Sequence, residues 1–255
     1  MINLKTRVIP CLLLKNQSLV KTVKFKKYNY IGDPVNTVKI FNELEVDELM
    51  FLDIFASLEN RDINFNILTD IANECFMPLS YGGNIKNFDD AKKIFNLGFE
   101  KIIINSNAFD NLELINQTSK IFGNQSIIGS IDIKKNFFGK KKIYSNHGTK
   151  KQNYEIIDWA KQLEKAGVGE LLITSIENEG SWNGYDIELI RSITENVQVP
   201  VIANGGCGSV NHIAEVVNKA NASACAVGSM FVYQKKGMGV LVNFLNRKEQ
   251  AKIFE

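Results

Sequence analysis

Eight short apolar segments, each followed by a longer segment of mixed polarity, restrict the fold of this chain more than any other feature. They are residues 8–14, 48–53, 77–81, 101–105, 126–132, 170–175, 199–203 and 222–227. Apolar segments of about four to eight residues are typical of parallel strands that are buried on both faces. Repeated alternation of strand and helix predicts an α/β protein, a (β/α)₈ barrel. A doubly wound open sheet is the alternative, because it has the same alternation.

The segments between the apolar ones have the periodicity of amphipathic helices. In residues 33–44 the apolar side chains recur at helical spacing, and Asp33 precedes Pro34. Aspartate is a favoured N-cap and proline is favoured in the first turn, so we expect a helix to begin here. Residues 62–73 and 154–166 are expected to be helical for the same reason.

A repeat of about 120 residues favours the closed barrel over the open sheet. Features that recur at this offset are Glu48 with Glu170, Gly82-Gly83 with Gly205-Gly206, and Asn105-Ser106 with Gly228-Ser229. Two halves of four strands each close naturally into one barrel. We therefore expect a single domain over residues 1–255, with half-barrels at about 1–122 and 123–255.

Length and charge agree with a barrel and exclude several classes of partner. The 255 residues fit a fold that is typically about 250 residues long. With 30 basic and 28 acidic residues, the net charge of +2 indicates neither a nucleic-acid nor a membrane partner. No apolar stretch is long enough to span a membrane, and no signal-peptide cleavage pattern is present. These observations predict a cytoplasmic protein.

The cysteines and histidines are too dispersed to suggest a metal site or a disulfide framework. The four cysteines, at positions 11, 75, 207 and 225, form no Cys-x-x-Cys motif, and there are only two histidines. Buried thiols are the more common outcome for such cysteines. We therefore expect neither a metal nor a cofactor.

The paired glycines suggest sites for phosphate groups. Gly82-Gly83 and Gly205-Gly206 each follow a strand, where free backbone N–H groups can surround a phosphate. One such pair could simply serve a tight turn. Two equivalent pairs, each followed one strand later by Asn105-Ser106 or Gly228-Ser229, favour a ligand with a phosphate at each end.

Charged residues mark both ends of the predicted strands. Asp53 and Asp132 follow strands at the carboxyl end, where a partly buried carboxylate suits general acid/base chemistry. A supporting role fits Asp53 about equally well. Leu13 occupies the position equivalent to Asp132 in the other half. At the opposite end, four charged residues begin strands, and spacing alone favours ion pairs that stabilise the barrel. These four are Arg7, Glu48, Lys101 and Glu170.

Several segments resemble one enzyme family, the cyclase subunit of imidazole glycerol phosphate synthase (HisF). The matching segments are residues 7–12, 32–35, 47–54, 82–83, 104–106, 130–132, 184–186 and 205–206. They span nearly the whole chain and keep the order of the family. The resemblance implies a lyase whose bisphosphorylated ribulosyl-formimino carboxamide substrate binds at the two glycine pairs. It also extends the expected binding residues to Lys21, Gly180 and Ser181.

The resemblance also implies a partner and a route for ammonia. In the family, a glutaminase (HisH-like) docks at the amino end of the barrel, and its ammonia travels through the barrel to the substrate. The gate of that route in the family matches four residues of this chain, namely Arg7, Glu48, Lys101 and Glu170. Asp132 matches one of two catalytic aspartates of the family, whereas Leu13 replaces the other. Loss of a positioned acid/base typically costs about 10²–10⁴-fold in rate.

The departures from the family pattern suggest a divergent branch. Besides Leu13, two further positions depart from that pattern. Glu179-Gly180-Ser181 stands where the family has Asp-Gly-Thr, and Asn84 stands where it has a third glycine. Residues 10–15 and 19–25 resemble HisF-like proteins of bacterial surface-polysaccharide clusters. That resemblance implies transfer of ammonia, with a separate sugar amidotransferase, to form an acetamidino group on a nucleotide-linked sugar.

Three hypotheses follow from these resemblances, in this order. The first is a HisF-like synthase subunit that passes ammonia on for modification of a surface sugar. The second is the histidine-pathway cyclase, which forms imidazole glycerol phosphate and AICAR. The third is a non-catalytic protein that binds a phosphorylated effector and activates its glutaminase. The identity of residue 13 places the first hypothesis ahead of the second.

Overall fold

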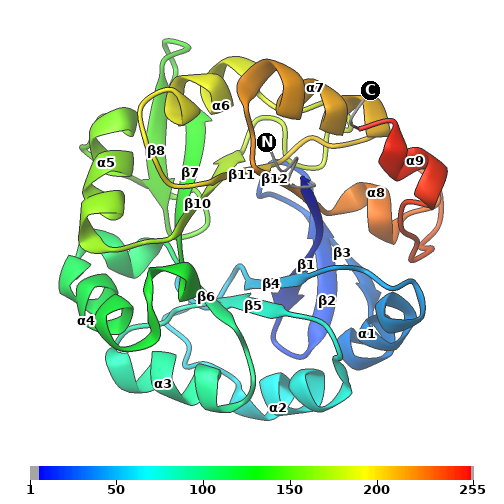
Figure 1. The fold of residues 1–255 in the computed structure, drawn as a ribbon, viewed down its shortest axis with the longest axis horizontal. Coiled ribbons are helices and arrows are strands. Elements are labelled where there is room, and N and C mark those ends of the chain that lie inside the picture. Colours follow the sequence, from blue (N-terminus) through cyan, green and yellow to red (C-terminus); the bar gives the residue numbers. More distant parts are fainter. Residues whose placement is uncertain (1–5, 254–255) are drawn as a thin grey trace.

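Eight parallel strands close into a barrel in the computed structural model, which describes residues 6–253 (Figure 1). The ends of the predicted domain, residues 1–5 and 254–255, lie outside the described part. The barrel strands are β1 (Arg7–Lys15), β4 (Leu49–Asp53), β5 (Leu79–Gly82), β6 (Lys101–Ile104), β7 (Ile127–Lys135), β10 (Glu170–Ser175), β11 (Val201–Asn204) and β12 (Ala224–Val227). Each pairs with the next, β7 pairs with β10, and β12 pairs with β1. The predicted (β/α)₈ barrel is confirmed, and the open sheet is wrong.

Helices surround the barrel as an outer ring (Figure 1). They are α1 (Pro34–Glu43), α2 (Phe65–Glu74), α3 (Phe88–Asn96), α4 (Leu112–Phe122), α5 (Ile156–Ala166), α6 (Ile187–Thr194), α7 (Val210–Ala220), α8 (Ser229–Val232) and α9 (Arg247–Ala251), with 3₁₀ turns η1 (Ser106–Phe109) and η2 (Asn124–Ser126). As expected, Asp33 caps α1. Helix α2 begins later than predicted because the Asn64 side chain caps it by accepting from the Ile67 N–H. Within residues 6–253, no helix combines the length and hydrophobicity needed to cross a membrane.

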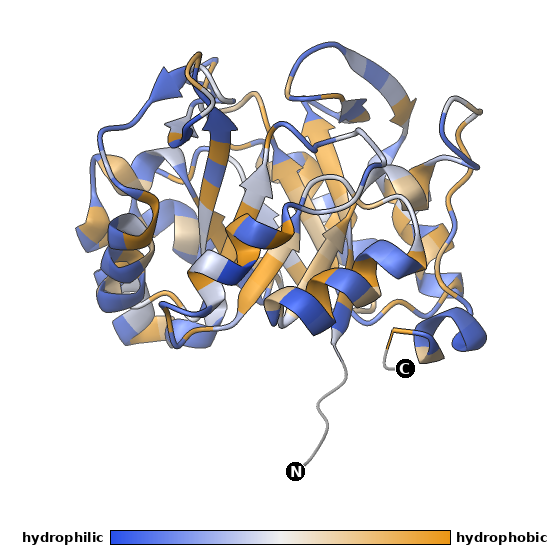
Figure 2. Ribbon diagram, turned by 90° about the horizontal axis from the view of Figure 1, so that it is seen from above, coloured by the Kyte–Doolittle hydropathy of each residue, from blue (hydrophilic) through white to orange (hydrophobic). Residues whose placement is uncertain are grey.

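Two antiparallel hairpins extend the barrel at the carboxyl ends of β1 and β7. Strands β2 (Ser18–Thr22) and β3 (Tyr28–Gly32) follow β1, and β8 (Lys141–Ser145) and β9 (Lys150–Lys151) follow β7. Leu13 is in register with Val20, and Asp132 with Tyr144. Both hairpins rise above the same end of the barrel, where they form walls around its mouth (Figure 2).

The barrel strands are buried on both faces, which explains why their sequences are continuously apolar. Their outward side chains, such as Phe51 and Ile102, form one large cluster together with buried helix side chains such as Phe41 and Leu114. Their inward side chains form a smaller cluster in the barrel. The inner cluster comprises Ile9, Cys11, Leu13, Val20, Met50, Ile103, Ile128, Leu172, Ile202, Ala224 and Ala226. Polar side chains are therefore displaced to the two ends of the strands.

The N-cap of α1 provides a local test of this fold. The Asp33 carboxylate accepts a hydrogen bond from the Asn36 N–H at 2.8 Å. We expect Asp33→Ala to lower the free energy of unfolding by about 1 kcal/mol, and Asp33→Ser to lower it by less, because serine can replace the cap. Urea denaturation of both variants measures this difference. Equal losses in the two variants would show that the cap is not what stabilises this turn.

Candidate functional site

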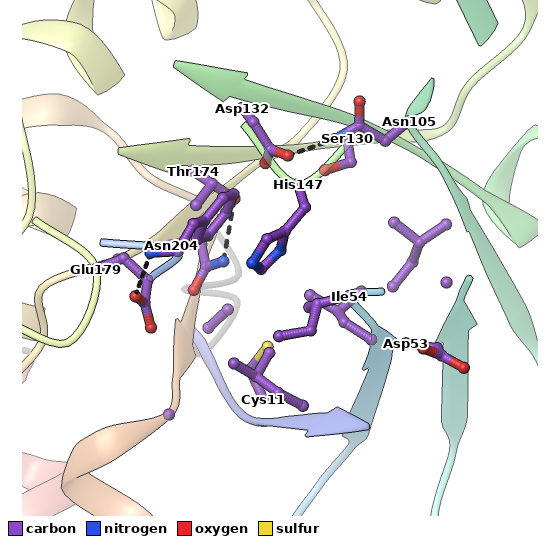
Figure 3. Close-up of a pocket in the computed structure, with 18 of the residues that line it drawn as sticks. Cys11, Asp53, Ile54, Asn105, Ser130, Asp132, His147, Thr174, Glu179 and Asn204 are labelled. Atoms are coloured by element: carbon purple, nitrogen blue, oxygen red, sulfur yellow. Dashed lines mark hydrogen bonds between the residues drawn. The ribbon is translucent and has the colours of Figure 1, made fainter. Parts of the chain in front are cut away.

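A pocket of about 110 Å³ opens at the carboxyl ends of the barrel strands (Figure 3). The structure brings nearly all of the predicted site residues of this end into its lining. These are Lys21, Asp53, Gly82, Gly83, Asn105, Ser106, Asp132, Gly180, Gly205, Gly206, Gly228 and Ser229. Ser181 lines a neighbouring cavity instead. Because these residues come from both halves of the sequence, only the closed barrel can place them around one space.

Asp132 is one of three buried acids in the pocket lining. It lies near the end of the buried part of β7, and burial raises the pKa of its carboxyl to about 7, although hydrogen bonds to Asn105 and Thr174 oppose this shift. The Asn105 amide donates to Asp132 Oδ2 at 2.8 Å (Figure 3). A carboxyl with a pKa near neutrality can both give and take a proton, as general acid/base chemistry requires.

Asn105 also offers an unsatisfied acceptor beside this acid. Its Oδ1 atom is buried and has no hydrogen-bond partner within the described part of the chain. A buried carbonyl oxygen without a partner costs free energy. A donor group on a bound ligand would satisfy it, so Asn105 and Asp132 together suit a ligand that has both a donor and a titratable group.

The side of the pocket around Leu13 is apolar. Leu13 is buried and in register with Leu52 of β4, and Cys11, Leu52 and Ile54 line the same side. Burial raises the pKa of the Cys11 thiol to about 12, so this group remains protonated and unreactive. Near Leu13 the pocket thus has an apolar surface where symmetry with Asp132 would have placed an acid.

Asp53 lies at the edge of the pocket, but its carboxylate already forms an ion pair with another side chain. Its two carboxylate oxygens accept hydrogen bonds from Arg61 at 2.9 and 2.8 Å. Its Cβ also packs so closely on Gly83 that a side chain at residue 83 would clash. These contacts fit the supporting role that the sequence left open for Asp53 better than transfer of protons. Sequence reasoning missed Arg61, because nothing in its spacing links it to a strand end.

The glycines of the second pair are required by the backbone. Gly205 and Gly206 have φ angles of 91° and 110°, and an added Cβ at Gly206 would lie 2.1 Å from the Gly184 carbonyl oxygen. At Gly228 an added Cβ would lie 2.7 Å from the Lys21 Nζ atom. The absence of a side chain there lets the lysine reach the strand end. These glycines therefore form a side-chain-free wall beside a cation, which is suited to an anionic group.

Glu179 holds the β2–β3 hairpin over the pocket. Its carboxylate accepts from Lys21 Nζ at 3.1 Å and from the Phe25 N–H at 3.2 Å, and its carbonyl oxygen accepts from the Lys24 N–H at 3.0 Å. Both members of the Lys21–Glu179 ion pair are buried. Sequence reasoning singled out Lys21 and the change at residue 179, but nothing in the sequence indicated that they would pair.

His147 is a pocket residue that sequence reasoning missed. It lies between β8 and β9, and its ring stacks on Phe25 with centroids 5.2 Å apart and contacts Phe55 at 4.6 Å. Burial lowers the pKa of the imidazole, which favours its neutral form. The stack joins the two hairpins across the mouth. Its position in a loop without periodic pattern left no signal in the sequence.

The four predicted charged residues of the opposite end form a closed ring of ion pairs. Arg7 contacts Glu48 at 2.7 Å and Glu170 at 2.9 Å, and Lys101 contacts the same two carboxylates at 3.3 and 3.0 Å. Arg7, Lys101 and Glu170 are the first residues of β1, β6 and β10, and Glu48 directly precedes β4. We call this set the charged ring. It lies at the amino end of the barrel, where these strands begin.

No metal site is visible in residues 6–253, where no three His, Cys, Asp or Glu side chains gather closely enough to hold an ion. The four cysteines lie there as free thiols.

The charged ring makes a testable contribution to stability. We expect Glu48→Ala to lower the free energy of unfolding by about 2–4 kcal/mol, because Arg7 and Lys101 would each lose one of two carboxylates in a largely buried site. Asp47→Ala is the matched control, since Asp47 is exposed and makes no ion pair within the described part of the chain. Its effect should stay within about 0.5 kcal/mol. Similar losses in both variants, measured by urea denaturation, would contradict a stabilising ring.

The raised pKa of Asp132 predicts a dependence of stability on pH. The ordinary pKa is 3.8, so between about pH 4 and pH 7 the folded protein holds a proton here that the unfolded chain has released. The unfolded chain then binds fewer protons, and this carboxyl makes the protein less stable as pH rises through that window. Relative to the native protein, Asp132→Asn should gain about 2–4 kcal/mol of unfolding free energy between pH 4 and pH 8. A difference that does not change with pH would contradict the raised pKa.

Several known proteins are similar to almost the whole of this chain. The sequence matches the family described as "Histidine biosynthesis protein" over residues 7–237. It is 48% identical over 240 residues to the putative imidazole glycerol phosphate synthase subunit hisF2 of Pseudomonas aeruginosa, covering 94% of this chain and 96% of that protein. It is 42% identical over 253 residues to the putative subunit hisF3 of Vibrio vulnificus, with 99% and 97% covered. It is 39% identical over 252 residues to imidazole glycerol phosphate synthase subunit HisF of Methanococcus vannielii, with 91% and 93% covered. The chain therefore belongs to the histidine biosynthesis protein family, as a homologue of HisF.

Proposed function

We propose that this chain is the synthase subunit of an imidazole glycerol phosphate synthase, which combines ammonia from a partner glutaminase with a phosphorylated substrate. The observation that carries the proposal is that the two ends of the barrel carry different groups of charged and titratable side chains. One end has a closed ring of charges, and the other has a pocket with a carboxyl whose pKa is about 7. The names of the relatives support this function ahead of the sugar modification that the sequence alone favoured.

The proposed route of ammonia runs from the charged ring through the inner cluster to the pocket. A glutaminase would dock on the amino-end face, over Arg7 and Lys101. The inner cluster that follows consists of apolar side chains. Such a passage suits neutral ammonia, because an ammonium ion would lose its hydration there without compensation. Entry requires the ring to open, so at least one of its ion pairs would have to break.

Within the pocket, we assign proton transfer to Asp132 and phosphate binding to the glycine walls. Addition of ammonia to a carbonyl carbon of the substrate requires a proton for the oxygen that leaves as water. A carboxyl that is protonated near neutral pH can supply that proton, and its carboxylate can take one back when the ring closes. Gly82-Gly83 and Gly205-Gly206 lie on opposite sides of the barrel mouth, as a substrate with a phosphate at each end requires.

Leu13 favours a second candidate function. A histidine-pathway cyclase of the family pattern would have a second acid here, whereas this pocket has a buried leucine among Cys11, Leu52 and Ile54. A barrel that delivers ammonia without closing an imidazole ring would not need that acid. Under this candidate, the ammonia would serve acetamidino formation on a nucleotide-linked sugar, together with a separate amidotransferase.

Turnover with free ammonia distinguishes the two functions, because it requires no partner chain. The bisphosphorylated ribulosyl substrate would be given to the native protein, to Leu13→Asp and to Leu13→Asn, which has nearly the same shape as aspartate but no titratable group. Formation of imidazole glycerol phosphate by the native protein, with a loss of about 100-fold or more in Asp132→Asn, is the expected result.

Two other results would change the assignment. If only Leu13→Asp is active, the native protein does not close the imidazole ring, and the sugar pathway becomes the better candidate. If Asp132→Asn is as active as the native protein, the proposed role of Asp132 is wrong.

A further inference from the structure

The β7–β8 hairpin carries two phenylalanines at its tip that the rest of the described chain leaves uncovered. Phe137 is 98% exposed and Phe138 is 83% exposed. They lie in the turn between β7 and β8, where the hairpin reaches beyond the outer ring of helices (Figure 1). A pair of large apolar side chains on a protruding tip marks a surface for interaction rather than part of the core.

The turn that presents the two rings has a defined conformation. The Asn136 side chain accepts hydrogen bonds from the Phe138 N–H at 3.0 Å and from the Lys140 N–H at 2.9 Å, and the Asn136 N–H donates to the Lys140 carbonyl oxygen at 2.8 Å. Gly139, with a φ angle of 77°, completes the turn. The two rings meet edge to face, with centroids 5.6 Å apart. Their exposure therefore follows from how the turn is built.

The hairpin around this tip is strongly basic. Residues 133–154 contain seven lysines and no acidic residue. The net charge of +2, which indicated no membrane partner, is an average that conceals this segment, because the remainder of the chain is net negative. A local surface of this kind attracts anionic partners even when the whole molecule is nearly neutral.

The lysines of the two strands lie directly opposite one another. Lys134 is in register with Lys142, and Lys135 with Lys141. Like charges in opposite positions destabilise an antiparallel pair of strands. Acidic residues of neighbouring segments pair with the two lysines of β8, but those of β7 form no ion pair within residues 6–253. An anionic partner would relieve this repulsion.

We infer that the tip of the β7–β8 hairpin binds the surface of an anionic phospholipid membrane. Phe137 and Phe138 would enter the boundary between headgroups and acyl chains, and the lysines behind them would lie at the lipid phosphates. Aromatic side chains favour that boundary, and the negative potential of the leaflet attracts lysines near it. An apolar tip followed by cations on both strands matches the order of layers in the leaflet. Such peripheral binding requires no membrane-spanning helix.

The geometry favours a lipid surface over other anionic partners. The planes of the two rings are 87° apart, so they cannot both stack on successive parallel bases of a nucleic acid. Two phenylalanines bury at most about 500 Å². A specific protein interface buries about 800 Å² on each partner, which is more than this tip supplies. A fluid lipid surface accepts both ring orientations and needs no complementary groove.

The inferred surface is separate from the proposed synthase site. None of residues 134–142 lines the pocket around Asp132. Turnover with free ammonia should therefore be the same in the hairpin variants below as in the native protein. Failure of membrane binding and failure of the synthase function are distinguishable for this reason.

Cosedimentation with vesicles tests the role of the two rings. We expect the native protein to bind vesicles of phosphatidylcholine mixed with phosphatidylglycerol, to be released by added salt, and to bind pure phosphatidylcholine weakly. The double variant Phe137→Ser/Phe138→Ser should bind the mixed vesicles about tenfold more weakly or worse. Phe76→Ser is the matched control, since Phe76 is 86% exposed but lies just before β5, at the other end of the barrel. It should bind as the native protein does.

A second pair of variants tests the lysines. A lysine near an anionic leaflet contributes about fivefold to binding, so Lys134→Gln/Lys135→Gln should lose about 25-fold. Relief of the repulsion should leave the hairpin at least as stable, so unfolding would not explain the loss. Lys120→Gln/Lys161→Gln removes the same charge from exposed positions on α4 and α5 and should change binding little.

Phe137→Trp reports insertion directly, because its emission should shift to the blue on mixed vesicles when the tip enters an apolar layer. Absence of that shift would overturn insertion of the tip. The inference is also wrong if the native protein does not sediment with mixed vesicles, or if the variant with two serines sediments equally well. Binding to polyglutamate or to an oligonucleotide in place of vesicles would assign the hairpin to another class of partner and overturn it too.

Discussion

The closed ring of eight parallel strands, with β12 beside β1, is the constraint on which the rest of the structure depends. Closure buries both faces of every strand, so almost the whole length of each must be apolar. Side chains that carry charge can then lie only where strands begin or end. The charged ring and the pocket around Asp132 are the two results of this single restriction, and they are separated by the apolar inner cluster.

The same restriction explains what could be predicted from the sequence. Strands such as 101–105 and 126–132 were visible as apolar segments, and residues at their ends, including Lys101 and Asp132, could be assigned to one end of the barrel from the amino-acid pattern alone. Contacts made by loops could not. Glu179 meets Lys21, and His147 meets Phe25, only because of turn conformations that have no periodic pattern. The neighbouring cavity that Ser181 lines is built from parts of three such segments, so the sequence indicated some of its lining residues, such as Lys21 and Gly180, but not the cavity itself.

The pocket is asymmetric although the sequence repeats. The side near β1 and β4 presents Leu13 and Leu52, and the side near β7 and β10 presents Asp132 and Thr174. We propose that the two halves of the chain are related half-barrels, of which one kept its acid while the other became an apolar wall. A substrate that binds here would meet a polar surface on one side and a hydrophobic surface on the other.

The hairpin that covers the mouth is a continuation of a barrel strand. Leu13 is paired in register with Val20, and the ladder continues through Lys21 and Thr22 to β3. Side chains alternate between the faces of a strand, so inserting or deleting one residue in β2 would turn Lys21 away from the pocket. During evolution, therefore, the cover can change length at its tip, at residues 23–27, while β2 has to keep its residue spacing between Val20, the partner of Leu13, and Lys21.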